Sequence, residues 1–354
     1  MIKIQHENVS TSRNVKIPEN LVWGHSFTDY CFIMKYSKDN GWYDAKITKT
    51  QNLEIHPAAM VFHYGQTVFE GLKAYKNNKG EITLFRPNKN IERMNKSCKR
   101  LVMPEIPEDV FMQALKELVT LEKEWIPTGY GESLYIRPFM IATQPALGVK
   151  PSNEYLFVII LSPVGAYYPE GFKPVKILVE EHYVRAVKNG LGECKTAANY
   201  AASLLAAEEA KQKGFSQVLW LDAIERKYLE EVGTMNIFIN FDDEIVTPEL
   251  NGSILHGVTR DSVLTLLRDW GLNVSERKIS IDEVWEKHKQ GKLISAFGTG
   301  TAAIISPISH LSYKGETILI NDGKVGELDQ KLFDEISKIQ YGLIEDKFNW
   351  IIKI

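Results

Sequence analysis

Lys195 is the residue whose type and position most clearly suggest chemistry. It lies in the stretch LGECKTAANY, residues 191–200, among small residues at the head of an alanine-rich segment with high helix propensity. The helix macrodipole mildly disfavours a lysine at that position, and most lysines are solvated. A deprotonated lysine amine is a nucleophile, so the other polar segments decide whether Lys195 is more than a surface residue.

Two glycine turns and one glutamate are the other candidates. Residues 257–259 open an amphipathic helix, and the free N–H groups of such a start suit a phosphate. In FGTGTAA, residues 297–303, backbone N–H groups and the hydroxyls of Thr299 and Thr301 could hold a carboxylate or phosphate. Glu231 precedes an apolar strand, where a buried carboxylate needs a cation or a proton. Each feature alone is weak, because many turns and loop glutamates bind nothing.

The elements that must position these residues alternate between strands and helices. Residues 281–290 are expected to form a helix with Ser280 and Glu283 as a capping box. No G-x-G-x-x-G follows a strand, so the pattern predicts an α+β fold with mixed sheets rather than a Rossmann fold. We expect strands at 31–37, 41–50, 81–87, 133–143, 154–161, 217–223, 236–241, 293–298 and 302–308, and helices at 91–103, 109–125, after Lys195, at 259–270, at 281–290 and from near Leu328.

Length and composition limit the classes of protein. The 354 residues are 44% hydrophobic and 25% charged with a net charge of −3, which is typical of a soluble globular chain with about two domains. We expect a small N-terminal domain at 1–161, an interdomain loop at 162–174 and a large C-terminal domain at 175–354. No basic surplus indicates nucleic-acid binding, and no apolar run is long enough for a membrane span.

The N-terminus and the cysteines indicate a location in the cytoplasm. The first twenty residues lack the pattern of a signal peptide. Cys31, Cys98 and Cys194 are far apart and form no CxxC, which argues against a disulfide scaffold or a zinc site. Cys194 beside Lys195 is expected to be a small packed thiol.

Taken together, the segments around Glu231 and Gly257 resemble a known family. Glu231-x-Gly233-x-x-Asn236 with the following Leu255-x-Gly257-Val258-x-Arg260 is similar to the motif of class-IV pyridoxal-phosphate aminotransferases. The chain resembles the branched-chain-amino-acid aminotransferases of that class over nearly its whole length, which implies a fold-type IV enzyme. The matching stretches are 23–30, 64–75, 84–94, 133–149, 162–168, 192–202, 231–236 and 297–303.

The resemblance implies a cofactor, pyridoxal 5'-phosphate, and the residues that bind it. Lys195 would carry it as a Schiff base and move a proton as general base and acid. Glu231 would keep the pyridine nitrogen protonated, and Arg93 would clamp the phosphate. Tyr200 would bind the ring's phenolate oxygen, and Leu255 would pack against the ring. The full implied set is Lys195, Arg93, Tyr200, Glu231, Thr234, Leu255, Gly257, Val258, Thr259 and Thr301.

The same resemblance implies the substrates and a homodimer. The enzyme would exchange the amino group between leucine, isoleucine or valine and 2-oxoglutarate in a ping-pong reaction. Leu147 and Val149 would come from the partner subunit and complete a shared active site. Tyr64, Arg137, Thr301 and Ala302 would bind carboxylates, and Phe27, Phe69, Tyr135 and Tyr167 would form the wall for the branched side chain.

The sequence departs from the family pattern at two places, and two alternative functions are considered. His256 stands where the family usually has proline, and Ala303 and Ser306 stand where animal relatives have a CxxC redox pair. One alternative keeps the fold and cofactor but acts on D-amino acids or as an aminodeoxychorismate lyase. The other is a non-catalytic protein that binds a phosphate ligand.

Overall fold

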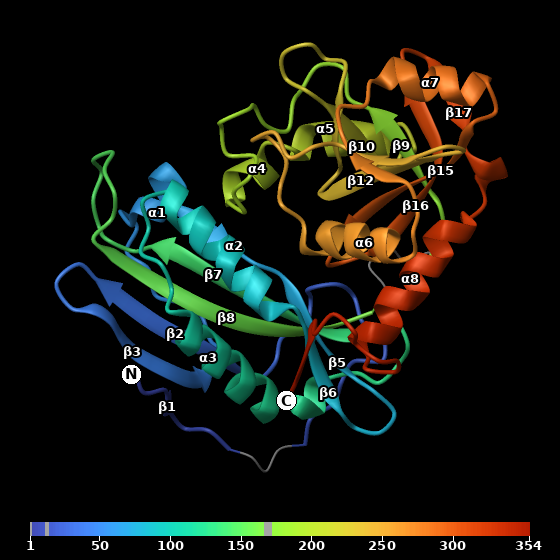
Figure 1. Cartoon of the computed structure of the whole chain (residues 1–354). Coiled ribbons are helices and arrows are strands. Elements are labelled where there is room, and N and C mark those ends of the chain that lie inside the picture. Colours follow the sequence, from blue (N-terminus) through green and yellow to red (C-terminus); the bar gives the residue numbers. More distant parts are fainter. Residues whose placement is uncertain (1, 11–13, 166–171) are drawn as a thin grey trace. The chain divides into compact units, whose positions relative to one another are not determined.

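The computed structural model describes residues 2–10, 14–165 and 172–354. The chain divides into two compact units, whose elements are labelled in Figure 1. The first unit comprises Met1–Tyr167, Cys194–Ala197 and Lys338–Ile354, and the second comprises Tyr168–Glu193 and Ala198–Ser337. None of the helices in the described ranges combines the length and the apolar character that a bilayer span requires.

The unit boundaries differ from the expected ranges at two places. The C-terminal residues 338–354 belong to the first unit because strand β18 (Ile351–Lys353) pairs with β6 (Ile82–Phe85). Residues 194–197 also belong to it, since Thr196 forms a β-bridge with Val68. Of the expected interdomain loop at 162–174, residues 162–164 end strand β8 and residues 166–171 lie outside the described ranges.

The first unit is built on a nine-stranded sheet in the order β1-β3-β2-β8-β7-β5-β6-β18, with β4 paired to β7. One large core cluster includes Phe32, Phe111 and Phe157. The alternation of apolar residues on the strands and the apolar faces of α2 and α3 account for this core. The elements besides β6 and β18 are β1 Gln5–His6, β2 Tyr30–Ser37, β3 Gly41–Lys49, α1 Met60–Tyr64, β4 Thr67–Phe69, β5 Leu72–Lys76, α2 Pro87–Arg100, α3 Glu108–Leu121, the 3-10 helix Lys123–Trp125, β7 Ser133–Ala142 and β8 Glu154–Val164.

The second unit contains another nine-stranded sheet, in the order β11-β10-β9-β16-β15-β12-β13-β14. Strand β17 pairs with β16, and β11 also pairs with β12, which closes the strands from β11 to β12 into a ring. Helix α8 begins in this unit and ends in the first. The elements are β9 Val175–Val179, α4 Ala197–Ala201, α5 Leu204–Gln212, β10 Gln217–Leu221, β11 Leu229–Val232, β12 Met235–Phe241, β13 Ile245–Thr247, α6 Val258–Asp269, β14 Val274–Glu276, α7 Ile281–Lys289, β15 Leu293–Gly300, β16 Ile304–Tyr313, β17 Glu316–Leu319, the 3-10 helix Asn321–Gly323 and α8 Glu327–Gln340.

The expected mixed α+β elements are confirmed, with shifted ends. Helix α2 starts at Pro87 instead of residue 91, because proline suits the first helical position. The hydroxyl of Ser280 accepts the N–H of Glu283 at 3.0 Å, which is one of the two bonds of the expected capping box, while the Glu283 carboxylate binds Arg277. The helix expected after Lys195 consists of two pieces, α4 and α5, and Lys195 lies just before the first.

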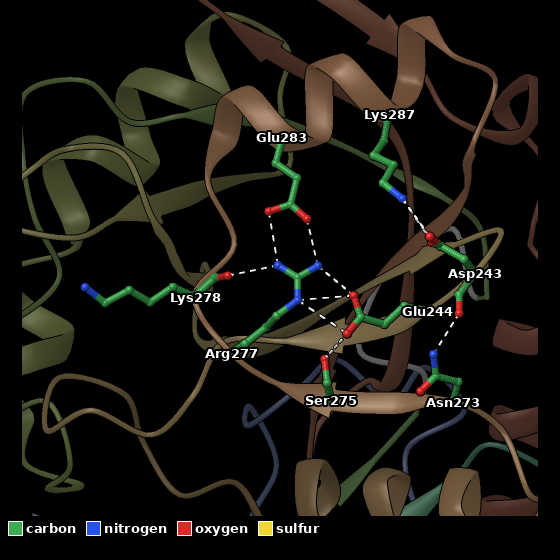
Figure 2. Close-up of polar contacts among 8 residues, drawn as sticks. All are labelled: Asp243, Glu244, Asn273, Ser275, Arg277, Lys278, Glu283 and Lys287. Atoms are coloured by element: carbon green, nitrogen blue, oxygen red, sulfur yellow. Dashed lines mark hydrogen bonds and ion pairs between the residues drawn. The ribbon is translucent and has the colours of Figure 1, made fainter.

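An ion-pair network joins the segment before β13 and the segment after β14 to α7 in the second unit (Figure 2). Arg277 binds Glu244 at 2.6 Å and Glu283, on α7, at 2.7 Å. Hydrogen bonds from the two carboxylates raise the pKa of Arg277 above its usual value. Lys287 of α7 also binds Asp243 at 3.0 Å. The network contains none of the predicted site residues, so we assign it to the fold.

Candidate active site

The backbone of Lys195 is held on both sides within the first unit. Its N–H donates to the hydroxyl of Ser97 at 3.0 Å, and its carbonyl accepts the N–H of Phe69 at 3.0 Å. The next residue, Thr196, donates its hydroxyl to the carbonyl of Thr67 at 2.7 Å. The Nζ atom of Lys195 lies 4.9 Å from the centroid of the Phe69 ring. The half-buried amine is therefore placed by strand β4 and helix α2.

Arg93 on α2 forms a buried two-point ion pair with Glu70. Its Nε and Nη2 lie 2.7 and 2.8 Å from the two carboxylate oxygens of Glu70. Asn90 donates to the same carboxylate at 2.8 Å. Burial raises the pKa of Glu70, but the charge and hydrogen bonds of Arg93, together with Lys195, outweigh it, and the pKa lies below its usual value. Glu70 is thus a charged group beside two predicted cofactor residues.

Ser97 connects these two parts of the first unit. Its hydroxyl accepts the Lys195 N–H and donates to the carbonyl of Arg93 at 3.1 Å. Sequence reasoning identified neither Ser97 nor Glu70. Glu70 belongs to the stretch FEGLKAY, and a carboxylate inside an apolar strand pattern is the signal that could have identified it.

Strand β7 presents the predicted substrate residues on one face. Residues 133–142 alternate between buried and half-buried positions, and Tyr135 and Arg137 are both on the half-buried face. Arg137 donates to the Tyr135 hydroxyl at 2.8 Å, and its guanidinium lies 4.7 Å from the Phe69 ring centroid. The Nε of Arg137 is buried and has no hydrogen-bond partner in the described part of the chain. Phe69 therefore lies close to both Lys195 and Arg137.

A second cation beside this face was also missed. Lys73 is opposite Tyr135 in the pairing of β5 with β7, and its Nζ lies 5.2 Å from the Trp23 ring centroid. Trp23 in turn contacts Tyr135, with 5.2 Å between ring centroids. Burial lowers the pKa of Lys73 to about 7. The wall predicted to be apolar therefore includes a buried amine that titrates near neutral pH.

Glu231 lies on β11 in the second unit, and protein donors bind both of its oxygens. Oε1 accepts the backbone N–H of Leu255 at 2.7 Å, and Oε2 lies 2.7 Å from Nε of Arg185. The Nδ2 of Asn236 is 3.5 Å from Oε1. This carboxylate is therefore buried, paired and fixed in orientation. Sequence reasoning gave no role to Arg185, since it is 46 residues from its partner in a loop without a motif.

The glycine turn before α6 is packed against β12. Asn236 donates to the carbonyl of Leu255 at 2.9 Å, and a Cβ on Gly257 would lie 2.0 Å from Oδ1 of the same asparagine. Only glycine fits this close approach. Helix α6 begins at Val258, and its N-cap residue, Gly257, has no side chain that could cap it. Its first N–H groups thus have the arrangement that binds an anion, as expected for residues 257–259.

Thr301 and Ala302 form the turn between β15 and β16, and both are half-buried. Strand β16 begins at Ile304 rather than at residue 302, because residues 301–303 form this turn. The hydroxyl of Thr299 is buried and lacks a hydrogen-bond partner among the described residues. The turn therefore keeps the backbone and hydroxyl groups that suit an anionic ligand.

Other predicted residues lie at exposed positions. Leu147 and Val149 are 68% and 87% exposed, and the Tyr64 hydroxyl donates to the carbonyl of Leu147. Phe27 is also exposed, and Thr234 is exposed in the turn between β11 and β12. Tyr64 and Leu147 thus form one exposed group.

Three further residues complete the predicted set. Tyr200 is half-buried on α4. Tyr167 lies outside the described residues. His256, the departure from the family pattern, is exposed, with Nε2 3.4 Å from Oε1 of Glu193.

Comparisons of the sequence and of the structure with known proteins find the same kind of relative. The family model described as "Amino-transferase class IV" matches residues 67–311. Branched-chain-amino-acid aminotransferase 2 of Bacillus subtilis is 57% identical over 99% of this chain and 97% of its own. The branched-chain amino acid aminotransferase of Escherichia coli has a TM-score of 0.73 at 26% identity, covering 92% of this chain and 98% of its own. The branched-chain amino acid aminotransferase of Thermobaculum terrenum, solved in its PLP form, has a TM-score of 0.75 at 24% identity, covering 92% and 98%.

Proposed function

The chain belongs to the class-IV amino-transferase family, and from this premise we propose how its residues perform a pyridoxal-phosphate-dependent transamination. The reaction exchanges the amino group of branched-chain L-amino acids with 2-oxoglutarate. The identity of 57% to a branched-chain-amino-acid aminotransferase over nearly the full length supports this function. The cytoplasm as its location stays a prediction.

The residues present fit the cofactor in charge and in donor type. In the second unit, the N-terminus of α6 after Gly257 suits a phosphate, and the Glu231 carboxylate suits a protonated pyridine nitrogen. In the first unit, Lys195 offers an amine and Arg93 a guanidinium. An arginine carries five N–H donors, and Glu70 accepts from two of those of Arg93. We propose that these residues bind pyridoxal phosphate.

When bound, the cofactor supplies an electron sink that stabilises negative charge on the substrate α-carbon. Lys195 would hold the cofactor through Nζ, and its free amine would move a proton to and from the substrate α-carbon. Glu231 would accept the pyridine N–H, and Arg93 would hold the phosphate. The Phe69 ring beside Nζ excludes water from one side of the amine.

We propose that Arg137 and Tyr135 orient the substrate. The buried Nε of Arg137 is a donor that a substrate carboxylate would satisfy, and its contact with the Tyr135 hydroxyl fixes the direction of the guanidinium. The rings of Phe69 and Tyr135 provide apolar contacts for a branched side chain. One wall thus offers both a cation for glutamate and apolar surface for leucine.

We propose that the enzyme is a homodimer with shared active sites. Leu147 and Val149 are the exposed apolar residues that the resemblance places in the partner's site. The bond from the Tyr64 hydroxyl to Leu147 groups Tyr64 with them. We therefore infer that Tyr64 also serves the partner's site rather than its own.

The observation that carries the catalytic assignment is the placement of Lys195, held at its N–H by Ser97 and at its carbonyl by Phe69. The test is a steady-state assay with L-leucine and 2-oxoglutarate, comparing wild type with Lys195→Ala and with Lys188→Ala as a matched exposed-lysine control. We expect Lys195→Ala to abolish turnover and Lys188→Ala to leave it unchanged. Turnover that survives in Lys195→Ala would contradict the assignment.

Substrate chirality and colour separate the alternatives. A purified protein that is yellow and bleaches with L-leucine, but not with D-leucine, supports the L-specific transaminase. Bleaching by D-amino acids alone would indicate the D-specific alternative. A colourless protein that binds phosphate compounds without turnover would indicate the non-catalytic one.

A further inference from the structure

Arg185 binds three acceptors from three segments of the second unit. Its Nε lies 2.7 Å from Oε2 of Glu231, Nη1 donates to the carbonyl of Ser253 at 2.9 Å, and Nη2 donates to the carbonyl of Gly192 at 3.1 Å. The side chains of Arg185 and Glu231 are 8% and 3% exposed. The planar fork of an arginine is what allows these bonds to form together, and lysine lacks it.

The backbone around Arg185 is tightly packed. A Cβ on Gly192 would lie 2.0 Å from the carbonyl oxygen of Ser253, so only glycine allows the two segments to approach this closely. Both carbonyls that Arg185 binds therefore lie in one closely packed pair of loops. The guanidinium is fixed by this backbone and in turn fixes Glu231.

Protein groups hold both oxygens of the Glu231 carboxylate. A carboxylate offers about four lone-pair sites. Arg185 and the Leu255 N–H occupy one on each oxygen, and Asn236 lies close to a third. These contacts, rather than solvent, set the direction in which the Glu231 carboxylate points.

We propose that Arg185 is a positioning residue that acts through Glu231. Its charge stabilises Glu231 as a buried carboxylate, and its fork fixes the direction from which Glu231 accepts the pyridine N–H of the cofactor. This inference rests on the proposed function, which gives Glu231 that role.

The neighbouring residue Glu230 indicates which carboxylate balances the positive charge of Arg185. Burial raises the pKa of Glu230 to about 7, although Ser253 donates a hydrogen bond to it and Arg185 lowers the pKa. The charges of Glu231 and Asp222 raise it further. Below neutral pH, Glu230 is therefore largely protonated, and the positive charge of Arg185 is balanced by Glu231.

A double-mutant cycle tests whether Arg185 acts through Glu231. The variants are Arg185→Met, Glu231→Gln and the double variant, with Arg185→Lys as the conservative change. Three quantities are measured: kcat with L-leucine, the cofactor's dissociation constant from quenching of apoprotein fluorescence, and the pH dependence of the bound cofactor's absorbance. The double variant leaves neither charge unpaired, so it keeps the test valid if Arg185→Met folds poorly.

We expect Arg185→Met to lower kcat about tenfold or more, as the loss of a charged hydrogen bond would. It should shift the pH dependence of the absorbance in the same direction as Glu231→Gln, and the double variant should be no slower than Glu231→Gln. Arg185→Lys should restore the absorbance profile in part. The matched control is Arg226→Met, because Arg226 also donates to two loop carbonyls, those of His182 and Tyr183. It should leave the profile unchanged.

Additive losses in the double variant, or an unshifted absorbance profile in Arg185→Met, would overturn the inference and show that Arg185 is only structural. If wild type does not transaminate L-leucine, the proposed function itself fails. If wild type is active but Glu231→Gln is unchanged, the role of Glu231 fails and the inference fails with it.

Discussion

Glu70 and Arg93 form a buried ion pair in the candidate site, with two N–H···O contacts of 2.7 and 2.8 Å. The side chain of Glu70 is fully buried, and that of Arg93 is 9% exposed. Removing one member of a buried pair leaves the other as an uncompensated charge. The phosphate-binding role proposed for Arg93 therefore depends on Glu70.

Glu70→Gln should reduce both stability and cofactor affinity. We expect a loss of about 3–5 kcal/mol in the free energy of unfolding, since a buried pair is broken. Urea unfolding of the apoprotein measures this, and fluorescence titration measures the cofactor's dissociation constant. Glu92→Gln is the control, because Glu92 pairs with Lys89 on the exposed face of the same helix at 2.8 Å. Equal effects of the two variants would contradict the importance of the buried pair.

Lys73→Met should change how stability depends on pH. The pKa of Lys73 in the folded protein is lowered to about 7 by burial, from 10.5. Between these values the unfolded chain binds more protons, so this group makes stability rise with pH. The variant should be more stable at neutral pH by on the order of 4 kcal/mol, and its stability should depend less on pH.

Urea unfolding from about pH 6 to about pH 9 checks this expectation, with the exposed Lys79→Met as the control. If wild type and Lys73→Met show parallel stability curves over that range, the amine does not titrate as proposed.

The resistance of the enzyme to mild peroxide is a further prediction. Cys31, Cys98 and Cys194 are free and buried. Burial raises the pKa of Cys31 to about 11 and raises that of Cys98 still more. The thiol forms of Cys31 and Cys98 therefore predominate at neutral pH, and oxidation of these two residues should be slow.

An activity assay after peroxide treatment should show little loss and no intramolecular disulfide. The two cysteines to test for a disulfide are Cys98 and Cys194, which interact electrostatically in the fold although they are distant in the sequence. Rapid inactivation that dithiothreitol reverses, and that Cys194→Ser or Cys98→Ser prevents, would contradict the prediction.

Local patterns predicted the elements well and the supporting contacts poorly. The apolar periodicity of residues 259–270 and the capping box at Ser280 depend on near neighbours, which a sequence displays directly. The start of β16 after Thr301 was missed, because a turn and a strand of small residues have similar composition. The motif residues Lys195 and Glu231 were found by resemblance to a family.

The supporting partners depend on tertiary structure. Glu70 and Arg93 are separated by 23 positions, and Arg185 and Glu231 by 46, with no motif that links either pair. Sheet pairing and helix packing bring these residues together, and a single sequence does not display such long-range contacts. The buried state of Lys73 has the same origin, since its neighbour Tyr135 comes from a distant strand of the sheet.

The most direct test of the account is the identity of the lysine that binds the cofactor. Borohydride reduction of the yellow protein fixes pyridoxal phosphate to its amine, and peptide mapping by mass spectrometry then locates the label. The account predicts a single label on Lys195, absent from Lys195→Ala and unchanged in Lys188→Ala. A label on another lysine, such as the buried Lys73, would contradict the assignment of Lys195 as the catalytic residue.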